Sequence, residues 1–241
     1  MPRSETPTPF PETRWSVVFE LRSSSEPARQ KAMAELCEIY WKPLYASARF
    51  SGHSAHDAED LTQGFFARLL RRGNLGPLTP DQGRFRTFLK SAFRNYTIDA
   101  ARRENRQKRG GGAEWLSLDF ASGERQYQRA LADSSTPGDG YDRVWAHTLL
   151  GHAIAALRRK YEERGRAETL RQLEVFLEAD TAAPSYAEIA TRLGQSENTI
   201  AANVSRLRRE FRTLLRQEVA ETLADPLEVD DELRYLLRAA A

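Results

Sequence analysis

Basic residues are concentrated in one stretch of this sequence, from residue 84 to residue 109. The only carboxylates that oppose them within the stretch are Asp99 and Glu104. Such a concentration of positive charge predicts contact with a polyanion, although the net charge of the chain is only +2. The balancing acidic residues gather near the C-terminus, between Glu218 and Glu232. The basic residues of the stretch are Arg84, Arg86, Lys90, Arg94, Arg102, Arg103, Arg106, Lys108 and Arg109.

A second stretch, residues 184–217, has the pattern of two helices joined by a tight turn. Ser185 and Glu188 have the spacing of a capping box, in which each side chain accepts a hydrogen bond from a free backbone N–H group. Gly194 stands where a left-handed residue ends the first helix, and Ser196 stands where a cap begins the second. A short helix, a three-residue turn and a longer helix predict a helix-turn-helix.

The second of these helices has one apolar and one polar face. Its predicted buried stripe is Ile200, Val204, Leu207, Phe211 and Leu214. Polar and basic residues lie mostly off that stripe and remain available for contacts: Asn198, Thr199, Asn203, Arg206 and Arg209. An ordinary αα-hairpin with a solvated arginine face is the alternative interpretation of this segment.

The sequence contains no recognisable catalytic motif. It has no phosphate-binding loop, no nucleophile-and-base pattern and no metal cluster, so we expect no enzyme, no cofactor and no metal. The single cysteine, Cys37, sits in an apolar run and is predicted to be a small buried residue. We find neither a leader peptide nor a membrane span, which predicts a cytoplasmic protein.

The helical periodicity, with no long alternating strand pattern, predicts an all-α fold of two helical domains joined by a flexible linker. Pro43 is expected to start one helix and Ser54 to cap the next, and a Gly- and Pro-rich loop is expected over 73–84. The expected divisions are a disordered lead-in (1–12), an N-terminal domain (13–112), a linker with little core of its own (113–142), the helix-turn-helix domain (143–217) and an acidic tail (218–241).

Three motifs in order resemble the sigma-70 family of transcription factors, extracytoplasmic-function (ECF) group. SAHDAEDLTQGFFARLL (54–70) is similar to the DAEDL helix of those factors, and GRFRTFLKSAFRNYTIDAARR (83–103) is similar to the helix that follows it. SYAEIATRLGQSENTIAANVSRLRR (185–209) resembles their C-terminal helix-turn-helix. Each motif alone is common, but together they cover most of the chain.

The resemblance implies contact with core RNA polymerase, at the β′ clamp helices and the β flap. Carboxylates of the DAEDL helix would pair with a basic partner, and an aromatic side chain would be the buried anchor. The implied polymerase-binding residues are Asp57, Glu59, Asp60, Gln63 and Phe66. Helix capping by Asp57 and Glu59 is the alternative role of these carboxylates, and both roles are compatible.

The resemblance also implies recognition of promoter DNA at two elements. Opening the −10 element requires basic groups along the phosphates and aromatic faces for unpaired bases, and the loop 78–83 would help form a base pocket. The implied −10 residues are Arg84, Arg86, Phe88, Lys90, Arg94, Asn95, Arg102 and Arg103. The implied −35 residues are Ser196, Asn198, Thr199, Asn203, Arg206 and Arg209. Phe85 and Leu89 are expected to belong to the core.

The sequence therefore predicts a group-four sigma factor, with core polymerase, promoter DNA and, where one exists, an anti-sigma factor as partners. It departs from the family pattern at Phe88, where a Trp is usual, and in the unusually long stretch before the helix-turn-helix. The alternatives are a freestanding helix-turn-helix regulator and a helical adaptor that does not bind DNA. We further hypothesise that the acidic tail folds back on a basic surface and weakens DNA binding.

Overall fold

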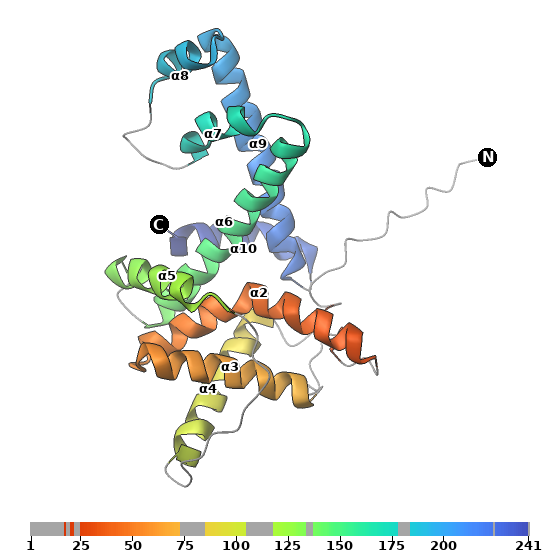
Figure 1. Ribbon diagram of the computed structural model, residues 1–241, viewed down its shortest axis with the longest axis vertical. Helices are drawn as coiled ribbons and strands as arrows, with labels where there is room; N and C mark the ends of the chain where they lie inside the picture. The colour runs from red at the N-terminus through yellow and green to blue at the C-terminus, as the bar shows by residue number, and fades with distance from the viewer. Residues whose placement is uncertain are drawn as a thin grey trace, which may run out of the picture. The chain divides into compact units, whose positions relative to one another are not determined.

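The computed structural model describes residues 17, 20–21, 25–72, 85–104, 118–133, 137–177, 184–223 and 225–240. All regular structure in these ranges is helical and none of it is strand, which confirms the all-α prediction. The principal helices (Figure 1) are α2 (Glu26–Phe50), α3 (Ala55–Arg72), α4 (Phe85–Glu104), α5 (Phe120–Asp133), α6 (Pro137–Glu163), α7 (Ala167–Leu173), α8 (Tyr186–Leu193), α9 (Glu197–Glu221) and α10 (Val229–Ala240). Two short 3-10 turns, Glu174–Leu177 and Pro226–Glu228, follow α7 and precede α10.

The chain divides into two compact units. The first comprises Met1–Thr148 together with Val219–Ala241, and the second comprises Leu149–Glu218. The chain therefore leaves the first unit within α6 and returns to it within α9. As a result, the segment predicted to be a separate acidic tail belongs to the same unit as the N-terminal helices.

Helix α2 is continuous through Pro43, so the expected helix start at this proline is wrong. A proline inside a helix removes one backbone hydrogen bond and disturbs the preceding turn. The burial of Pro43 and of its neighbours Trp41 and Leu44 offsets that cost here. The next helix begins as expected, since the backbone N–H of Asp57 donates to Ser54 Oγ at 3.1 Å.

The core of the first unit is built from aromatic and aliphatic side chains that lie far apart in the sequence. Tyr40 of α2 stacks on Trp145 of α6 with ring centroids 4.9 Å apart, and its edge meets Phe85 of α4 at 5.3 Å. Phe85 is 2% exposed and Leu89 is fully buried, as predicted. Other fully buried side chains of this core are Met33, Leu36, Leu44, Tyr45, Phe66, Phe93 and Tyr141.

Helix α5 occupies residues that were expected to be linker. It packs against α2, and its Tyr127 and Ala130 are buried, so the prediction of little core in this segment is wrong for residues 120–133. A β-carbon at Gly123 would lie 2.7 Å from the Trp41 ring, so glycine permits the close approach of the two helices. Arg49 and Glu124 join the same helices through a salt bridge of 2.9 Å.

Helix α10 is amphipathic, and one face of it is buried in the first unit. Val229 is 6% exposed and Leu236 is 4% exposed, while Glu232 on the same face is completely buried. Leu237, which lies outside this face, stays 54% exposed. The C-terminal segment is therefore a packed element of the first unit.

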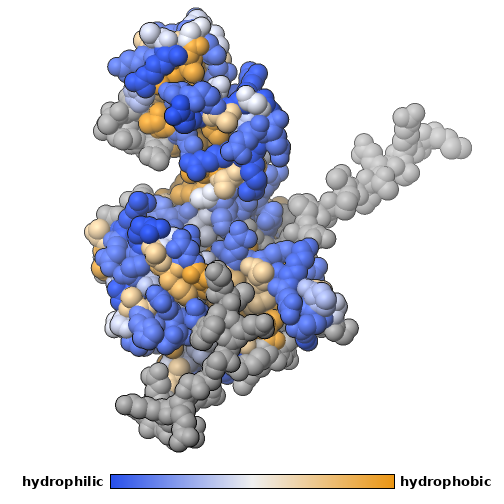
Figure 2. Space-filling view, in the orientation of Figure 1, coloured by the Kyte–Doolittle hydropathy of each residue, from blue (hydrophilic) through white to orange (hydrophobic). Residues whose placement is uncertain are grey.

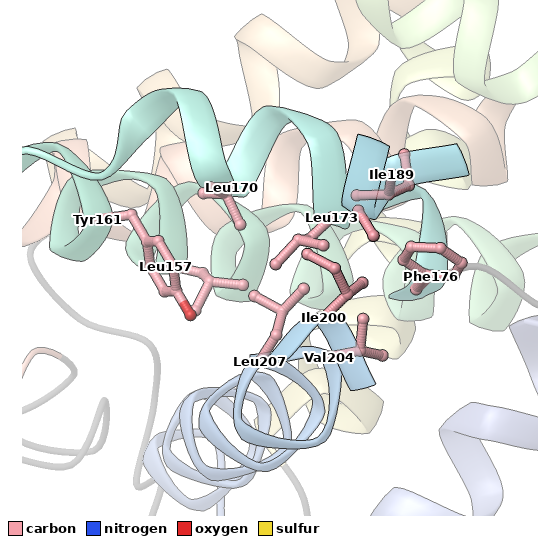
Figure 3. Close-up of a cluster of buried hydrophobic side chains, with 10 residues drawn as sticks. Leu157, Tyr161, Leu170, Leu173, Phe176, Ile189, Ile200, Val204 and Leu207 are labelled. Atoms are coloured by element: carbon pink, nitrogen blue, oxygen red, sulfur yellow. The ribbon is translucent and has the colours of Figure 1, made fainter. Parts of the chain in front are cut away.

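A compact apolar cluster holds the second unit together (Figure 3). Leu157 and Tyr161 of α6 meet Leu170 and Leu173 of α7, and Ile200 of α9 closes the cluster. Val204 and Leu207 continue the buried stripe predicted for α9, and Phe211 and Leu214 pack against it while partly exposed. The remaining members of the cluster are Phe176, Ile189 and Ala190.

The ends of α8 and α9 have the predicted capping groups. Glu188 N–H donates to Ser185 Oγ at 3.2 Å, and Ser185 N–H donates to Glu188 Oε2 at 2.9 Å, which completes the capping box. Gly194 adopts the left-handed conformation with φ of 61°, and it ends α8. At the start of α9 the backbone N–H of Thr199 donates to Ser196 Oγ at 3.2 Å. Local sequence chemistry thus accounts for this helix pair.

The face of the molecule shown in Figure 2 is mostly hydrophilic and is interrupted by smaller apolar patches. None of the described helices combines the length and the apolar character needed to cross a membrane.

Candidate nucleic-acid interface

The first turns of α3 present carboxylates to solvent. Asp57 and Asp60 are exposed, whereas Glu59 and Gln63 are half-buried. Ser54 Oγ donates to Asp57 at 2.7 Å, and this hydrogen bond lowers the pKa of Asp57. The carboxylate of Asp57 therefore stays charged while it supports the helix start, and both predicted roles are physically compatible. Asp60 lies 3.8 Å from His56, one turn away.

Phe66 does not lie on that surface. Its side chain is fully buried and packs beside Phe65, with ring centroids 5.7 Å apart. An anchor for a partner must expose apolar surface before binding, and Phe66 has none to offer. The prediction that Phe66 anchors a partner is therefore corrected: it is a core residue that helps to hold α3 against its neighbours.

Helix α4 has an exposed stripe that includes three of the predicted −10 residues. Arg94, Asn95 and Arg102 are exposed at helical spacing. Phe88, at the edge of this stripe, is partly exposed and lies against Phe85 with ring centroids 6.3 Å apart. Arg103 is helical, while Arg84 and the loop 78–83 lie outside the described residues. The exposed stripe thus combines positive charge, an amide and one aromatic edge.

Arg86 is not part of this surface, which corrects its assignment as a −10 residue. It is only 7% exposed, and its Nη1 lies 2.6 Å from Asp142 while its Nε lies 2.9 Å from Glu232. The ring of Tyr235 lies beneath the guanidinium at 4.7 Å. Burial alone would lower the pKa of Arg86, but Glu232 and Asp142 outweigh it and raise the pKa. Arg86 therefore joins α4, α6 and α10 within the first unit.

Lys90 lies one turn after Arg86 and is partly engaged by the same elements. Its ammonium is 3.9 Å from Asp142 and 4.6 Å from the ring centroid of Tyr141. The side chain retains 35% exposure. Lys90 therefore stands at the border between the buried ion pairs and the exposed stripe.

The predicted −35 residues of α9 fall on two adjacent faces. Asn198 and Arg209 share an exposed stripe with Ala202 and Ser205, two small residues that the sequence analysis did not select. Their signal in the sequence is small size on a helix face, which allows close backbone approach, whereas the predicted contacts are polar or charged side chains. Ser196 caps the helix, and its hydroxyl also exchanges a hydrogen bond of 2.8 Å with Thr199.

The other face of α9 borders a groove of about 320 Å³ within the second unit. Thr199, Asn203 and Arg206 line it together with Gln195 of the turn. The opposite wall was not predicted, although the sequence Arg164-Gly165-Arg166 at the end of α6 carries two basic residues around a helix-ending glycine. The residues of that wall and of the ends of the groove are Tyr161, Arg164, Arg166, Thr169, Leu173 and Glu210.

These features define a helical protein with exposed basic and amide groups on two separate units, which is typical of nucleic-acid binding. Residues 36–107 match the family model for sigma-70 region 2. The matched segment is less than half of the chain, and it includes the carboxylates of α3 and the exposed stripe of α4. The match supports a sigma-70 family sigma factor, a non-enzymatic initiation factor that binds core RNA polymerase and promoter DNA. No curated protein and no solved structure matches the chain.

Proposed function

We propose that this chain is an ECF-type sigma factor that directs core RNA polymerase to promoters with −10 and −35 elements. The observation that carries the proposal is the exposed stripe of α4, because it lies inside the segment that matches sigma-70 region 2. The proposal places the protein in the cytoplasm, with the polymerase.

In this proposal α3 binds the polymerase. Asp57 and Asp60 are exposed carboxylates, and Glu59 and Gln63 flank them. Exposed carboxylates steer association with a basic surface and add hydrogen bonds at the edge of an interface. The β′ clamp helices are the partner that the sigma-70 resemblance implies for this face, and the β flap is a second contact.

The same proposal assigns the −10 element to the exposed stripe of α4. Arg94 and Arg102 would follow the phosphates of the unpaired strand, and Phe88 would offer a partial stacking face. Asn95 has the donor and acceptor pair that reads a base edge. The two corrected residues, Phe66 and Arg86, take no part in these contacts.

The helix pair α8–α9 would act as the helix-turn-helix that reads the −35 element. The exposed stripe with Asn198 and Arg209 is the face best suited to base edges, since Ala202 and Ser205 let the backbone approach the major groove closely. A recognition helix that begins at a capped turn presents its first residues to the bases.

Co-elution with bacterial core RNA polymerase on size exclusion tests the function. The wild-type chain is expected to form a one-to-one complex. Asp60→Arg is expected to abolish that complex, because a cation would then face a basic partner. Asp231→Arg is the matched control, since Asp231 is 69% exposed on α10 and Asp60 is 62% exposed on α3.

The outcomes separate the proposal from its rival. A folded wild-type chain that does not associate with a cognate core contradicts the sigma-factor function and leaves a freestanding regulator, for which DNA binding by the chain alone becomes decisive. Equal loss of association in both variants contradicts the assignment of α3 as the polymerase-binding face.

A further inference from the structure

Two cations of α4 are balanced by carboxylates that lie outside the segment matching sigma-70 region 2. Arg86 and Lys90 belong to that segment, whereas Asp142 of α6 and Glu232 of α10 do not. These four side chains, here called the ion cluster, carry two positive and two negative charges. The first turns of α4 therefore contribute less positive charge to the surface than their sequence suggests.

Asp142 is the centre of the ion cluster, and two short hydrogen bonds hold it in place. Its Oδ1 accepts from Arg86 Nη1 at 2.6 Å, and its Oδ2 accepts from the Tyr235 hydroxyl group at 2.7 Å. Glu232 faces the same guanidinium with both oxygens, at 2.9 Å from Nε and 3.5 Å from Nη2. The Asp142 side chain is only 15% exposed, so salt and water screen its charge less than that of a surface carboxylate.

Lys90 lies at the open edge of the ion cluster. Its ammonium is 3.9 Å from Asp142 Oδ2 and 4.6 Å from the centroid of the Tyr141 ring. A pair of this length and exposure holds a lysine only weakly. The carboxylate nevertheless stays beside Lys90 in every rotamer of the lysine, because Arg86 and Tyr235 fix it. A phosphate that approaches Lys90 therefore meets a fixed negative charge, and Lys90 must leave the Tyr141 ring to reach it.

Arg94, one turn further along α4, has a different environment. It is exposed, and none of the carboxylates that the structure describes is paired with it. The same helix thus carries one cation that is balanced within the chain and one that is available to a partner.

We propose that Asp142 is a specificity-determining residue, which keeps Lys90 from contributing a phosphate contact to the −10 interface. The inference rests on the proposed function, and it changes Lys90 from a predicted DNA contact to a group that is balanced within the chain. Phosphate contacts carry no sequence information, so withholding a cation lowers the affinity for all sequences alike. Binding then depends more on the exposed stripe, where Asn95 can read a base edge.

The salt dependence of binding to a single strand tests this role. Each phosphate contact contributes about 0.7 to the slope of log affinity against log salt concentration for single-stranded DNA. The full chain is titrated into a fluorescein-labelled strand of deoxythymidylates, and anisotropy is followed over a KCl series. Asp142→Asn is expected to raise the magnitude of the slope by about 0.7, and Lys90→Gln in the same chain is expected to abolish that increase.

Lys90→Gln alone is the arm that leaves the buried groups of the ion cluster untouched. It is expected to leave the slope unchanged, whereas Arg94→Gln, one turn away on the same helix, is expected to lower its magnitude by about 0.7. Glu124→Gln is the matched control for Asp142→Asn, since Glu124 is 29% exposed and is paired with Arg49 in the same unit. This control is also expected to leave the slope unchanged.

Three results would overturn the inference. The first is a slope that falls with Lys90→Gln as much as with Arg94→Gln. The second is an Asp142→Asn chain that binds the strand like the wild-type chain or like Glu124→Gln. The third is an increase in Asp142→Asn that persists after Lys90→Gln, because the released charge would then not act through Lys90.

Failure of the proposed function would look different. An unchanged slope in Arg94→Gln contradicts the −10 assignment of the exposed stripe, and the comparison of Asp142→Asn with the double variant then decides the inference. Polymerase co-elution does not enter these measurements. Its failure would remove the sigma-factor function, whereas the double variant would still report whether Asp142 balances Lys90.

Discussion

Substituting Glu232 by Gln should destabilise the first unit, although this residue lies near the end of the chain. The Glu232 side chain is 1% exposed, and its partner Arg86 is 9% exposed. Gln keeps the shape of Glu, so the substitution removes a charge and creates almost no cavity. It leaves the Arg86 guanidinium buried with Asp142 as its remaining carboxylate partner.

The magnitude follows from the burial of the pair. Removing one partner of a buried ion pair costs about 3–5 kcal/mol, since the other charge stays desolvated. Asp142 still lies 2.6 Å from Arg86, so the lower end, about 3 kcal/mol, applies. For a unit of this size each kcal/mol lowers the midpoint of thermal unfolding by about 2–4 °C. The expected decrease is therefore about 6–12 °C.

Tryptophan fluorescence during thermal unfolding is the assay, because all four tryptophans (15, 41, 115 and 145) precede the second unit. Asp231→Asn is the control: Asp231 is 69% exposed and pairs with Arg234 on the surface, where such a pair contributes less than about 1 kcal/mol. A shift for Glu232→Gln no larger than for Asp231→Asn would refute the reasoning. It would mean that α10 does not unfold cooperatively with the first unit.

Three further predictions concern the caps, the thiol and one carboxylate. Gly194→Ala should destabilise the second unit by about 1 kcal/mol, because Gly194 has a φ of 61°. Gly151→Ala, in the middle of α6, should instead stabilise the second unit by about 0.5–1 kcal/mol. Amide hydrogen exchange in α9 measures both changes, and equal effects would contradict the capping argument. Burial raises the pKa of Cys37 to about 12, so iodoacetamide at pH 8 should modify this thiol only after unfolding. The free energy of unfolding should also fall as the pH rises above about 9, because the thiol then ionises only in the unfolded chain. Rapid labelling of the folded chain would show that the thiol is accessible. Burial raises the pKa of Glu124, but hydrogen bonds from Arg49, Tyr45 and Gln128 outweigh it and lower the pKa to about 2, so the stability contributed above pH 4.5 is lost as the pH falls towards 2. Glu124→Gln should flatten this acid limb in fluorescence-monitored unfolding, and an unchanged limb would exclude Glu124 as its source.

The hypothesis that the acidic tail weakens DNA binding remains a prediction, but its simplest test has changed. Truncation after Val219 would remove Leu223, Val229 and Leu236 from the core and leave Arg86 without Glu232. A gain or loss of promoter affinity in such a variant would be mixed with destabilisation. Point substitutions on the exposed side of α10 avoid that problem.

Much of the local structure was predictable because its causes lie within a few residues. The capping box of Ser185 and Glu188, the left-handed Gly194 and the cap at Ser196 all occur as expected. The buried stripe of α9 also follows from spacing, since apolar residues every three or four positions can only face one side of a helix. Two of the three motifs that resemble the sigma-70 family, 54–70 and 83–103, lie within the segment that matches region 2, whereas the third, 185–209, lies outside it.

The sequence by itself therefore determined the helical class and the capped ends of α3, α8 and α9, and it supplied candidate residues for contact with polymerase and DNA. Tertiary structure decided which of those residues remain on the surface. Phe66 and Arg86 have the types and spacing of interface residues, yet both are buried. Phe66 packs in the core beside Phe65, and Arg86 is buried because α10 returns to the first unit and supplies Glu232. The periodicity of a helix gives the directions of its side chains, but only packing between distant segments determines which directions face solvent.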